Sequence, residues 1–391
     1  MKYEDMREKV DSVVESERDK LYEVNKWIFN HPELSGKEFE TSKKWAEFLK
    51  GEGYEVEYPY GGFETAFFAR KPLAGGREGK YKFAIMVEYD ALPEVGHACG
   101  HSLSGAISVL AGMALEPVCE ELDLEVHIIG TPAEEADGAK GYMVDKGLFQ
   151  GYDMAMMVHL NNYNMIAPDV KALSTYLFTF HGKAAHAGAA PWEGSNALSA
   201  GQLFFHACDM LRQHSRPECR IHGIFRNGGT NAGTVPDEAS VEMWIRSDDK
   251  KTHTELDRKL EDCARGAAIA TQCTYEKALI EHTYDPMKKN PAGQEVLKEI
   301  YGELGLPLNA PDNIFGSSDA GNVSQVIPTF HPLLELSPHD VVVHQKEFAD
   351  CVVSDRAYQA LADGAKIIAY QALRVFSRPD TLAAIKADFQ K

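Results

Sequence analysis

The sequence predicts an α/β protein with a three-layer domain built on a mostly parallel sheet, into which a smaller ferredoxin-like α+β domain is inserted. At 391 residues the chain is longer than one hydrophobic core usually supports. Apolar, strand-like runs alternate with helix-like segments over residues 54–160, the order typical of a parallel sheet covered on both faces. From about residue 172 the pattern changes to β-α-β-β-α-β, the order of the ferredoxin-like plan.

The first domain is expected to begin with a helix over residues 1–31 that ends at Pro32. An apolar run over 83–87 suits a buried strand, and the glycine and alanine content of 102–117 suits a helix packed closely on a sheet. The other elements expected up to residue 160 are helices over 37–53 and 138–148 and strands over 54–59, 64–69, 82–88, 124–129 and 153–160.

The insertion is expected over residues 172–284, so that 1–171 and 285–391 together form the first domain. Its expected elements are strands over 174–182, 220–227, 239–247 and 273–281 and helices over 194–214 and 252–271. The returning chain should then form a helix over 291–304, a glycine- and serine-rich loop over 315–324, a strand over 328–336 and a helix over 354–374.

Composition excludes several classes of partner. The formal net charge of −19 would repel nucleic acid and anionic membranes, so neither is expected to bind. No uncharged apolar run reaches the roughly 18 residues that a membrane span needs, and the charged first twenty residues lack the apolar segment of a signal peptide. The seven cysteines are scattered and odd in number, which favours reduced thiols and a cytoplasmic location.

The most informative stretch follows the apolar run at 83–87. Asp90 lies at the end of the expected strand, and a turn marked by proline and glycine then brings His97, Cys99 and His101 at intervals of two residues. A thiolate and imidazoles on one short loop can bind a metal ion. The alternative is a buried structural cysteine between hydrogen-bonded histidines, and this stretch alone does not decide between them.

Further potential ligands follow other strands of the expected sheet. Glu134 and Glu135 come directly after the strand at 124–129, and His159 lies near the end of the strand at 153–160. Each could be ordinary, because strand-end histidines are commonly structural and paired glutamates commonly lie in solvated loops. Together they fall beyond the carboxyl ends of the strands, where ligands bind in open α/β sheets.

Two metal ions that share one ligand need about five or six protein donors. The chain offers five, with Glu134 left free to act as a general base on a water acidified by the ions. Sulfur, nitrogen and oxygen donors together suit zinc best, with manganese or cobalt as alternatives. The five expected ligands are Cys99, His101, Glu135, His159 and His344.

Six stretches, spread over nearly the whole chain, resemble the successive motifs of the aminoacylase/carboxypeptidase superfamily of dimetal peptidases and amidohydrolases. The closest likeness is to its p-aminobenzoyl-glutamate hydrolase and β-alanyl-lysine dipeptidase branch. The stretches are EYDALPEVGHACGHSLSGA, GTPAEEADGAKGYMVDKGLF, FHGKAAHAGAAPWEGSNALSA, NGGTNAGTVPDEASVEMWIRS, GSSDAGNVSQVIPTFHPLLEL and HQKEFA.

The resemblance implies a role for each matched residue. Cys99 would bridge two metal ions, with His101 and His159 on one ion and Glu135 and His344 on the other. Glu134 would be the base, and Asp90 would orient the site from behind the ligands.

The resemblance also implies that the inserted domain is a lid that mediates homodimerisation. His186 would reach the active site of the partner subunit and stabilise the oxyanion. The substrate cleft would be lined by Gly316, Ser317, Ser318 and Asp319.

Two positions depart from the family pattern. Ser102 stands where the family usually has asparagine or aspartate after the C-G-H triplet, which could change the hydrogen bonding of His101. Gly233 stands where the family has an asparagine that helps hold the substrate, and Asn231 is the candidate to replace it. No specific substrate is therefore transferred from the family.

The leading hypothesis is a metal-dependent amidohydrolase that cleaves the amide bond of an N-acyl or aminoacyl amino acid. One alternative is a dipeptidase for β-alanyl or basic dipeptides. An alternative of another class is a catalytically silent relative that acts as a binding or regulatory partner. The chain lacks the H-x-E and P-C-x-x-C pairing of zinc deaminases and the G-x-S-x-G elbow of serine hydrolases.

Overall fold

The computed structural model describes residues 2–311 and 315–391 and divides the chain into two compact units. The first unit combines Met1–Asp169 with Met287–Lys391, and the second is Val170–Pro286. The bounds expected from the sequence for the second segment were 172–284.

The first unit contains a six-stranded sheet in the order β1-β2-β4-β3-β5-β13. β4, β3, β5 and β13 are parallel neighbours, whereas β1 and β2 are antiparallel additions at one edge. The predicted α/β class and mostly parallel sheet are therefore confirmed. The strands are β1 (Glu55–Glu57), β2 (Phe68–Arg70), β3 (Tyr81–Val87), β4 (Leu124–Gly130), β5 (Met154–Met156), β6 (His159–Asn161), β7 (Asp169–Val170, at the boundary between the units), β12 (Phe315–Gly316), β13 (Thr329–Phe330) and β14 (Leu333–Glu335).

Helices cover both faces of this sheet. On β3, the side chains of Phe83, Ile85 and Val87 join the core that includes α1, α3 and α10, whereas Ala84 and Met86 join the core that includes α4 and α8. Because successive side chains of a strand point to opposite faces, an apolar run of this kind requires cover on both sides. The helices are α1 (Tyr3–Phe29), α2 (Phe39–Gly51), α3 (His101–Leu122), α4 (Ala139–Asp145), α7 (Pro291–Glu303), α8 (Ala320–Val326), α9 (Lys346–Cys351), α10 (Asp355–Phe376) and α11 (Pro379–Phe389), with a 3₁₀ turn η1 (Ala74–Gly76).

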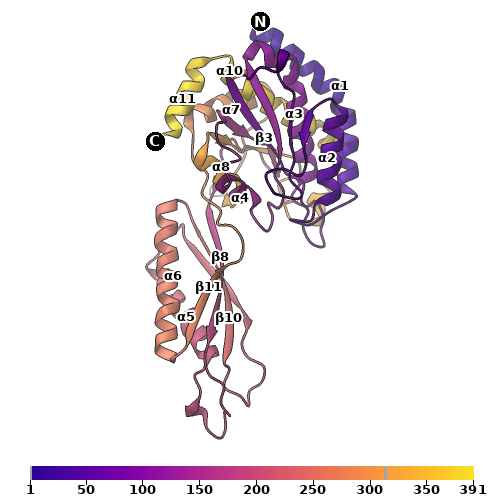
Figure 1. Cartoon of the computed structure of the whole chain (residues 1–391). Helices are drawn as coiled ribbons and strands as arrows, with labels where there is room; N and C mark the ends of the chain where they lie inside the picture. The colour runs from indigo at the N-terminus through magenta and orange to yellow at the C-terminus, as the bar shows by residue number, and fades with distance from the viewer. Residues whose placement is uncertain (1, 312–314) are drawn as a thin grey trace. The chain divides into compact units, whose positions relative to one another are not determined.

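α3 is a core helix. By length and composition alone it could cross a membrane, but 83% of its most apolar window is buried inside the protein. It packs against α1, α10, β3 and β4, which explains its apolar character (Figure 1). The helix continues to Leu122, past the expected end at residue 117, and Pro117 lies inside it.

Two of the expected strands are each divided in two. The segment 153–160 forms β5 and β6, and the segment 328–336 forms β13 and β14. β5 pairs with β13 in the main sheet, whereas β6 pairs with β14 in a separate two-stranded sheet. Pro332 lies at the break between β13 and β14 and has no N–H to donate. His159 is consequently the first residue of β6, not the end of a long strand.

The glycine- and serine-rich segment 315–324 was predicted to be a loop, and this was wrong in part. Its second half begins α8, whose Ala320 and Val323 pack with Met143 of α4 in the second core. Tertiary packing therefore overrides the loop-like composition. α9 and α11 were not predicted from the sequence.

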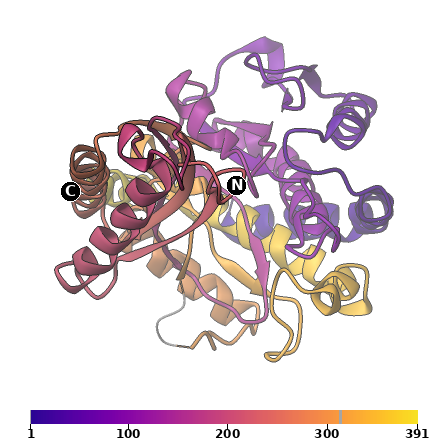
Figure 2. The ribbon, with the colours of Figure 1, turned by 90° about the horizontal axis from the view of Figure 1, so that it is seen from below.

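The second unit has a four-stranded sheet in the order β11-β8-β10-β9, in which β8 pairs antiparallel with β10 and β11, and β10 with β9. Its two helices pack on the same face of the sheet (Figures 1 and 2). Its elements are β8 (Ala172–His181), a 3₁₀ turn η2 (Pro191–Glu193), α5 (Ala197–Gln213), β9 (Arg220–Asn227), β10 (Glu238–Ser247), α6 (Lys250–Thr271) and β11 (Thr274–Leu279).

His253 ties the start of α6 to this sheet. Its Nε2 lies 2.8 Å from the Ser174 hydroxyl on β8, and its Nδ1 lies 3.1 Å from the Ser247 hydroxyl on β10. Burial lowers the pKa of His253 to about 4. An unfolded histidine binds a proton near pH 6.5, so His253 contributes stability above pH 6.5 that is lost as the pH falls toward 4.

We therefore expect His253→Gln to flatten the pH dependence of stability. A fully buried histidine of this kind contributes a slope of up to about 1.4 kcal/mol per pH unit between its unfolded and folded pKa values. Thermal unfolding followed at pH 7 and at pH 5 should show a smaller loss of melting temperature for the variant than for the wild type. An equal loss in both proteins would contradict this assignment.

Candidate metal centre

The candidate site lies beyond the carboxyl end of β3, the strand at which the chain changes direction across the sheet. β4 lies on one side of β3, and the next strand of the sheet, β5, lies on the other. Such a switch point opens a crevice between the loops of neighbouring strands. The loop and helix start after β3 carry Cys99 and His101, the loop after β4 carries Glu134 and Glu135, and β6 begins with His159.

Cys99, His101 and His159 form a first group whose donor atoms all lie within 4.8 Å of one another. The Nε2 atoms of the two histidines are 3.3 Å apart, and the Cys99 Sγ is 3.4 Å from His159 Nε2. Two donors on one tetrahedral zinc ion, each about 2.0–2.3 Å from it, stand about 3.3–3.8 Å apart. The spacing of the group therefore fits a single ion.

The hydrogen bonds of the two imidazoles support this fit. His101 Nδ1 lies 2.7 Å from the Asp90 carboxylate, and His159 Nδ1 lies 2.8 Å from the Leu160 carbonyl. Both partners are acceptors, so each Nδ1 carries a proton, and Nε2 is the atom that each ring can offer to a metal ion. Burial, and then the charge of His101, lower the pKa of His159 to about 3, which keeps its ring neutral. The two Nε2 atoms, 3.3 Å apart, stand at the separation of two donors on one ion.

Cys99, Glu135 and His344 form a second group with the same spacing limit of 4.8 Å. His344 Nε2 is 3.3 Å from Cys99 Sγ and 3.6 Å from Glu135 Oε1. The backbone of His344 has a left-handed φ of 69°, and its N–H donates to the Ala98 carbonyl, which fixes it beside the cysteine loop. Cys99 belongs to both groups, as a bridging ligand would.

The Cys99 thiol keeps its proton in these buried surroundings unless a positive charge lies beside it. Burial, together with the charge of Glu135, raises its pKa well above the usual range. A thiol in such surroundings loses its proton when a metal ion binds it.

Glu134 lies next to these groups and is 8% exposed. Its carboxylate belongs to a further cluster with His101 and Glu135 within 4.8 Å. Burial, and then the charges of Glu88 and Glu135, hold the pKa of Glu134 well above its usual range. A carboxyl group that readily binds a proton is suited to general base catalysis.

Asp90 connects three parts of the site. Its Oδ1 accepts from His101 Nδ1, and its Oδ2 accepts from the Glu135 backbone N–H at 2.9 Å and from the Ser35 hydroxyl at 2.7 Å. Burial alone would raise the pKa of Asp90, but His101 and these hydrogen bonds outweigh it and lower the pKa. Asp90 therefore orients both a histidine and the glutamate loop.

A buried lysine lies behind the site. Lys140 Nζ is 2.7 Å from Glu88 Oε1 and 2.6 Å from Asp319 Oδ1, and all three side chains are fully buried. Burial lowers the pKa of Lys140, but the charges of Asp319 and Glu88 outweigh it, so the lysine stays protonated. Sequence analysis did not single out Lys140, because one lysine near the start of a helix has no distinctive pattern.

Of the four residues expected to line a substrate cleft, two are accessible. Gly316 is exposed and Ser317 is half-buried, whereas Ser318 is 6% exposed and its hydroxyl accepts from the Ala320 N–H. Asp319 is engaged with the Lys140 side chain and backbone. Its carboxylate is therefore committed to the interior and does not line an open surface.

Two residues near the cysteine loop do not join the groups. His97 is 1% exposed, and its ring centroid lies 6.4 Å from that of Phe29. The Ser102 hydroxyl is buried without a hydrogen-bond partner in the described chain. The departure at Ser102 thus leaves the bond between His101 and Asp90 in place.

His186 lies in the second unit, on a loop between β8 and α5. Its Nδ1 accepts from the backbone N–H groups of Gly188 at 3.2 Å and Ala189 at 3.1 Å. The proton of the neutral ring is therefore on Nε2, and the exposed side chain presents this N–H as a donor. A backbone bridge to Thr234 joins this loop to the segment that follows β9.

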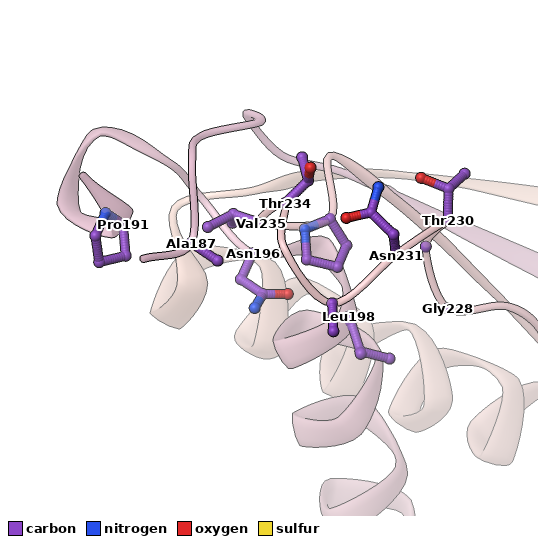
Figure 3. Close-up of a pocket in the computed structure, with 12 residues that line it drawn as sticks. Ala187, Pro191, Asn196, Leu198, Gly228, Thr230, Asn231, Thr234 and Val235 are labelled. Carbon is purple, nitrogen blue, oxygen red and sulfur yellow. The ribbon is translucent and has the colours of Figure 1, made fainter. Parts of the chain in front are cut away.

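A cavity of about 580 Å³ lies within the second unit between these two loops (Figure 3). Asn231 and Thr230 line it, and Asn231 Oδ1 accepts from the Gly233 N–H at 2.9 Å. A Cβ atom at position 233 would lie 3.2 Å from that oxygen. The amide of Asn231 thus lies against the space that a side chain at position 233 would enter.

The chain was compared with known proteins. Residues 84–372 match peptidase family M20/M25/M40. The Xaa-Arg dipeptidase of Mus musculus is 32% identical over 397 aligned residues, which cover 98% of this chain and 91% of that protein. A p-aminobenzoyl-glutamate hydrolase chain of Escherichia coli is 28% identical over 68% of this chain and 59% of its own length.

Two solved structures share the fold. The aminobenzoyl-glutamate utilization protein of Klebsiella pneumoniae superposes with a TM-score of 0.74 at 19% identity and covers 94% of this chain and 99% of its own. The YXEP protein of Bacillus subtilis, a dinuclear metal-binding peptidase, gives 0.67 at 20% identity over 92% and 99%.

The family match spans most of the chain and includes both donor groups, and the mouse relative extends the similarity over nearly all of it. The chain belongs to peptidase family M20/M25/M40, and it is a hydrolase that acts on amide bonds.

Proposed function

We propose that this chain is a dimetal amidohydrolase that cleaves the amide bond between an acyl or aminoacyl group and an amino acid. The observation that carries this proposal is the convergence of five donors from separate stretches around Cys99, beside the additional carboxylate of Glu134. A catalytically silent relative would not need to retain both the donors and the base.

His101 and His159 would hold one ion and Glu135 and His344 the other, with Cys99 shared between them. The mixed sulfur, nitrogen and oxygen donors favour zinc, with manganese or cobalt as alternatives. When bound, the ions would acidify a water molecule and polarise the scissile carbonyl.

Glu134 accepts a proton from the attacking water and later delivers it to the leaving amine. Its carboxylate lies within 4.8 Å of donor atoms of His101 and Glu135, and this position beside the ligands supports the role. His186 donates its Nε2 proton in a hydrogen bond to the oxygen on which charge develops. The two backbone donors on its Nδ1 support that tautomer.

For the substrate, two classes remain. The similarity to a p-aminobenzoyl-glutamate hydrolase chain favours an N-acyl amino acid. The 32% identity with a mammalian Xaa-Arg dipeptidase favours a dipeptide with a basic residue. Asn231 would contact the substrate in place of the asparagine that the family has at position 233.

The second unit would act as the lid and join two subunits. β9 is an edge strand of which only Ile221 is buried, and it exposes Ile224 (52%) and Phe225 (39%). An exposed apolar edge strand tends to pair with another chain, and pairing with a second copy of this chain would cover the edge of β9.

The seven free cysteines support a cytoplasmic location, because reduced thiols are typical of that compartment.

Replacing the base should abolish turnover without loss of metal. We expect Glu134→Gln to lower kcat by at least about 100-fold, because general base catalysis contributes on the order of 10²–10⁴. Metal analysis and circular dichroism should match the wild type. A variant with activity within tenfold of the wild type would exclude Glu134 as the base.

A paired substrate panel should separate the two substrate classes. The metal-reconstituted enzyme would be assayed with N-aroyl and N-acetyl amino acids and with dipeptides that end in arginine or lysine. We expect turnover of at least one class, and treatment with a chelator should remove it. A protein that hydrolyses neither and binds no transition metal would be a silent relative.

If His186 works across the dimer, two inactive variants should complement each other. Mixed dimers of His186→Ala and Glu134→Gln chains contain one site with both functional residues, so we expect partial recovery of activity. Isolated mixed dimers carrying two different affinity tags would be assayed beside each parent. No recovery in verified mixed dimers would show that His186 does not act on the partner subunit's site.

A further inference from the structure

The turn between α1 and α2, residues 33–38, reaches the candidate site from a part of the chain that sequence analysis left as a plain loop. Its Ser35 hydroxyl donates to Asp90, and its Glu33 carbonyl accepts from the Ala91 N–H. Glu38, at the start of α2, is fully buried although it carries a carboxylate.

The contacts of Glu38 explain why a carboxylate is buried there. Its Oε1 accepts from the Ala133 N–H at 2.8 Å and from the Gly36 N–H at 2.9 Å, and its Oε2 accepts from the Thr65 hydroxyl at 3.1 Å. Glu38 thus joins the turn, the segment before β2 and the loop after β4. The bond to Ala133 lies one residue before Glu134.

Ala133 needs such a restraint. It is a non-glycine residue with a left-handed φ of 56° and is 3% exposed. Non-glycine residues in this region are strained and keep their conformation only where surrounding contacts impose it. Without an acceptor the buried N–H would also be left unpaired, which destabilises the loop further. The loop would then be free to relax, and the two glutamates would move with it.

We propose that Glu38 is a positioning residue that fixes the direction of Glu134 by holding the strained peptide before it. This assignment rests on the proposed function of Glu134 as the base. Asp90 supports the same loop by accepting from the Glu135 N–H. The backbone on either side of Glu134 is therefore held by two different carboxylates, Glu38 at Ala133 and Asp90 at Glu135. Displacement of a catalytic group by about 1 Å can cost about 100-fold in rate.

The chain offers a matched control in Glu33. Its carboxylate accepts from the backbone N–H groups of Glu40 at 3.1 Å and Thr41 at 2.7 Å, so it also caps the start of α2 with two backbone bonds. Those bonds do not reach the glutamate loop. Glu33→Met and Glu38→Met each remove a carboxylate but keep a side chain of similar length, which limits cavity formation.

The experiment compares kcat, KM, metal content and melting temperature of Glu38→Met, Glu38→Gln and Glu33→Met in the full-length, metal-loaded enzyme. We expect Glu38→Met to lower kcat 10- to 100-fold with KM changed less than threefold and two ions retained. Glu38→Gln keeps an oxygen for the two backbone donors and should stay within about threefold of the wild type. Glu33→Met should lower the melting temperature while leaving kcat within twofold.

The double variant Glu38→Met/Glu134→Gln separates this inference from the proposed function. If Glu38 acts through Glu134, the double variant should turn over no more slowly than Glu134→Gln alone, because residues that act as a unit are non-additive. Suppose that Glu134→Gln is inactive but that Glu38→Met and Glu33→Met lose kcat equally. This result would overturn the positioning role of Glu38 and would leave Glu134 assigned as the base. An active Glu134→Gln enzyme would overturn both. If Glu38→Met does not fold, a Glu38→Gln enzyme with kcat reduced tenfold or more at normal stability would also contradict the assignment.

Discussion

Two hydrogen bonds at imidazole Nδ1 atoms constrain the whole ligand cluster. Asp90 takes the proton of His101, and the Leu160 carbonyl takes that of His159. Nε2 of each ring then faces the other ring, at a separation that two donors on one cation would have. The remainder of the first unit serves this arrangement: Asp90 follows the end of β3 at Val87, α3 starts at His101, and the break before β6 turns His159 away from the main sheet.

Much of this could be predicted because the relevant signals are local. The apolar run 83–87 and the strand at 124–129 identify neighbouring parallel strands, and acidic or histidine residues directly after such strands must gather at one edge. The division of 153–160 could not be read in the same way, because both halves are apolar and the break depends on which strand each half pairs with. In 328–336 Pro332 was a local signal for the break, since proline cannot donate to a strand ladder. The helical start after Asp319 was hidden for a similar reason, since only its packing on α4 makes it a helix.

Apart from Asp90, the residues that support the ligands could not be identified from the sequence. Glu38 looks like an ordinary acid in the first turn of a helix, where a negative charge is favourable in any case. Only the folded chain brings it to the Ala133 N–H, 95 positions away in sequence. Ligands belong to recognisable chemical types, whereas a side chain that holds a backbone N–H can be any acceptor at any distance along the chain.

The lysine behind the site affects which cations the protein can hold. Glu88, Glu134 and Asp319 bring carboxylate oxygens within 4.8 Å of one another, a grouping that by itself would attract a hard cation such as calcium or magnesium. An ammonium group already sits against two of these acids, so this corner of the interior carries its own permanent counter-ion. In this corner of the interior the lysine supplies the positive charge that a bound cation would otherwise supply.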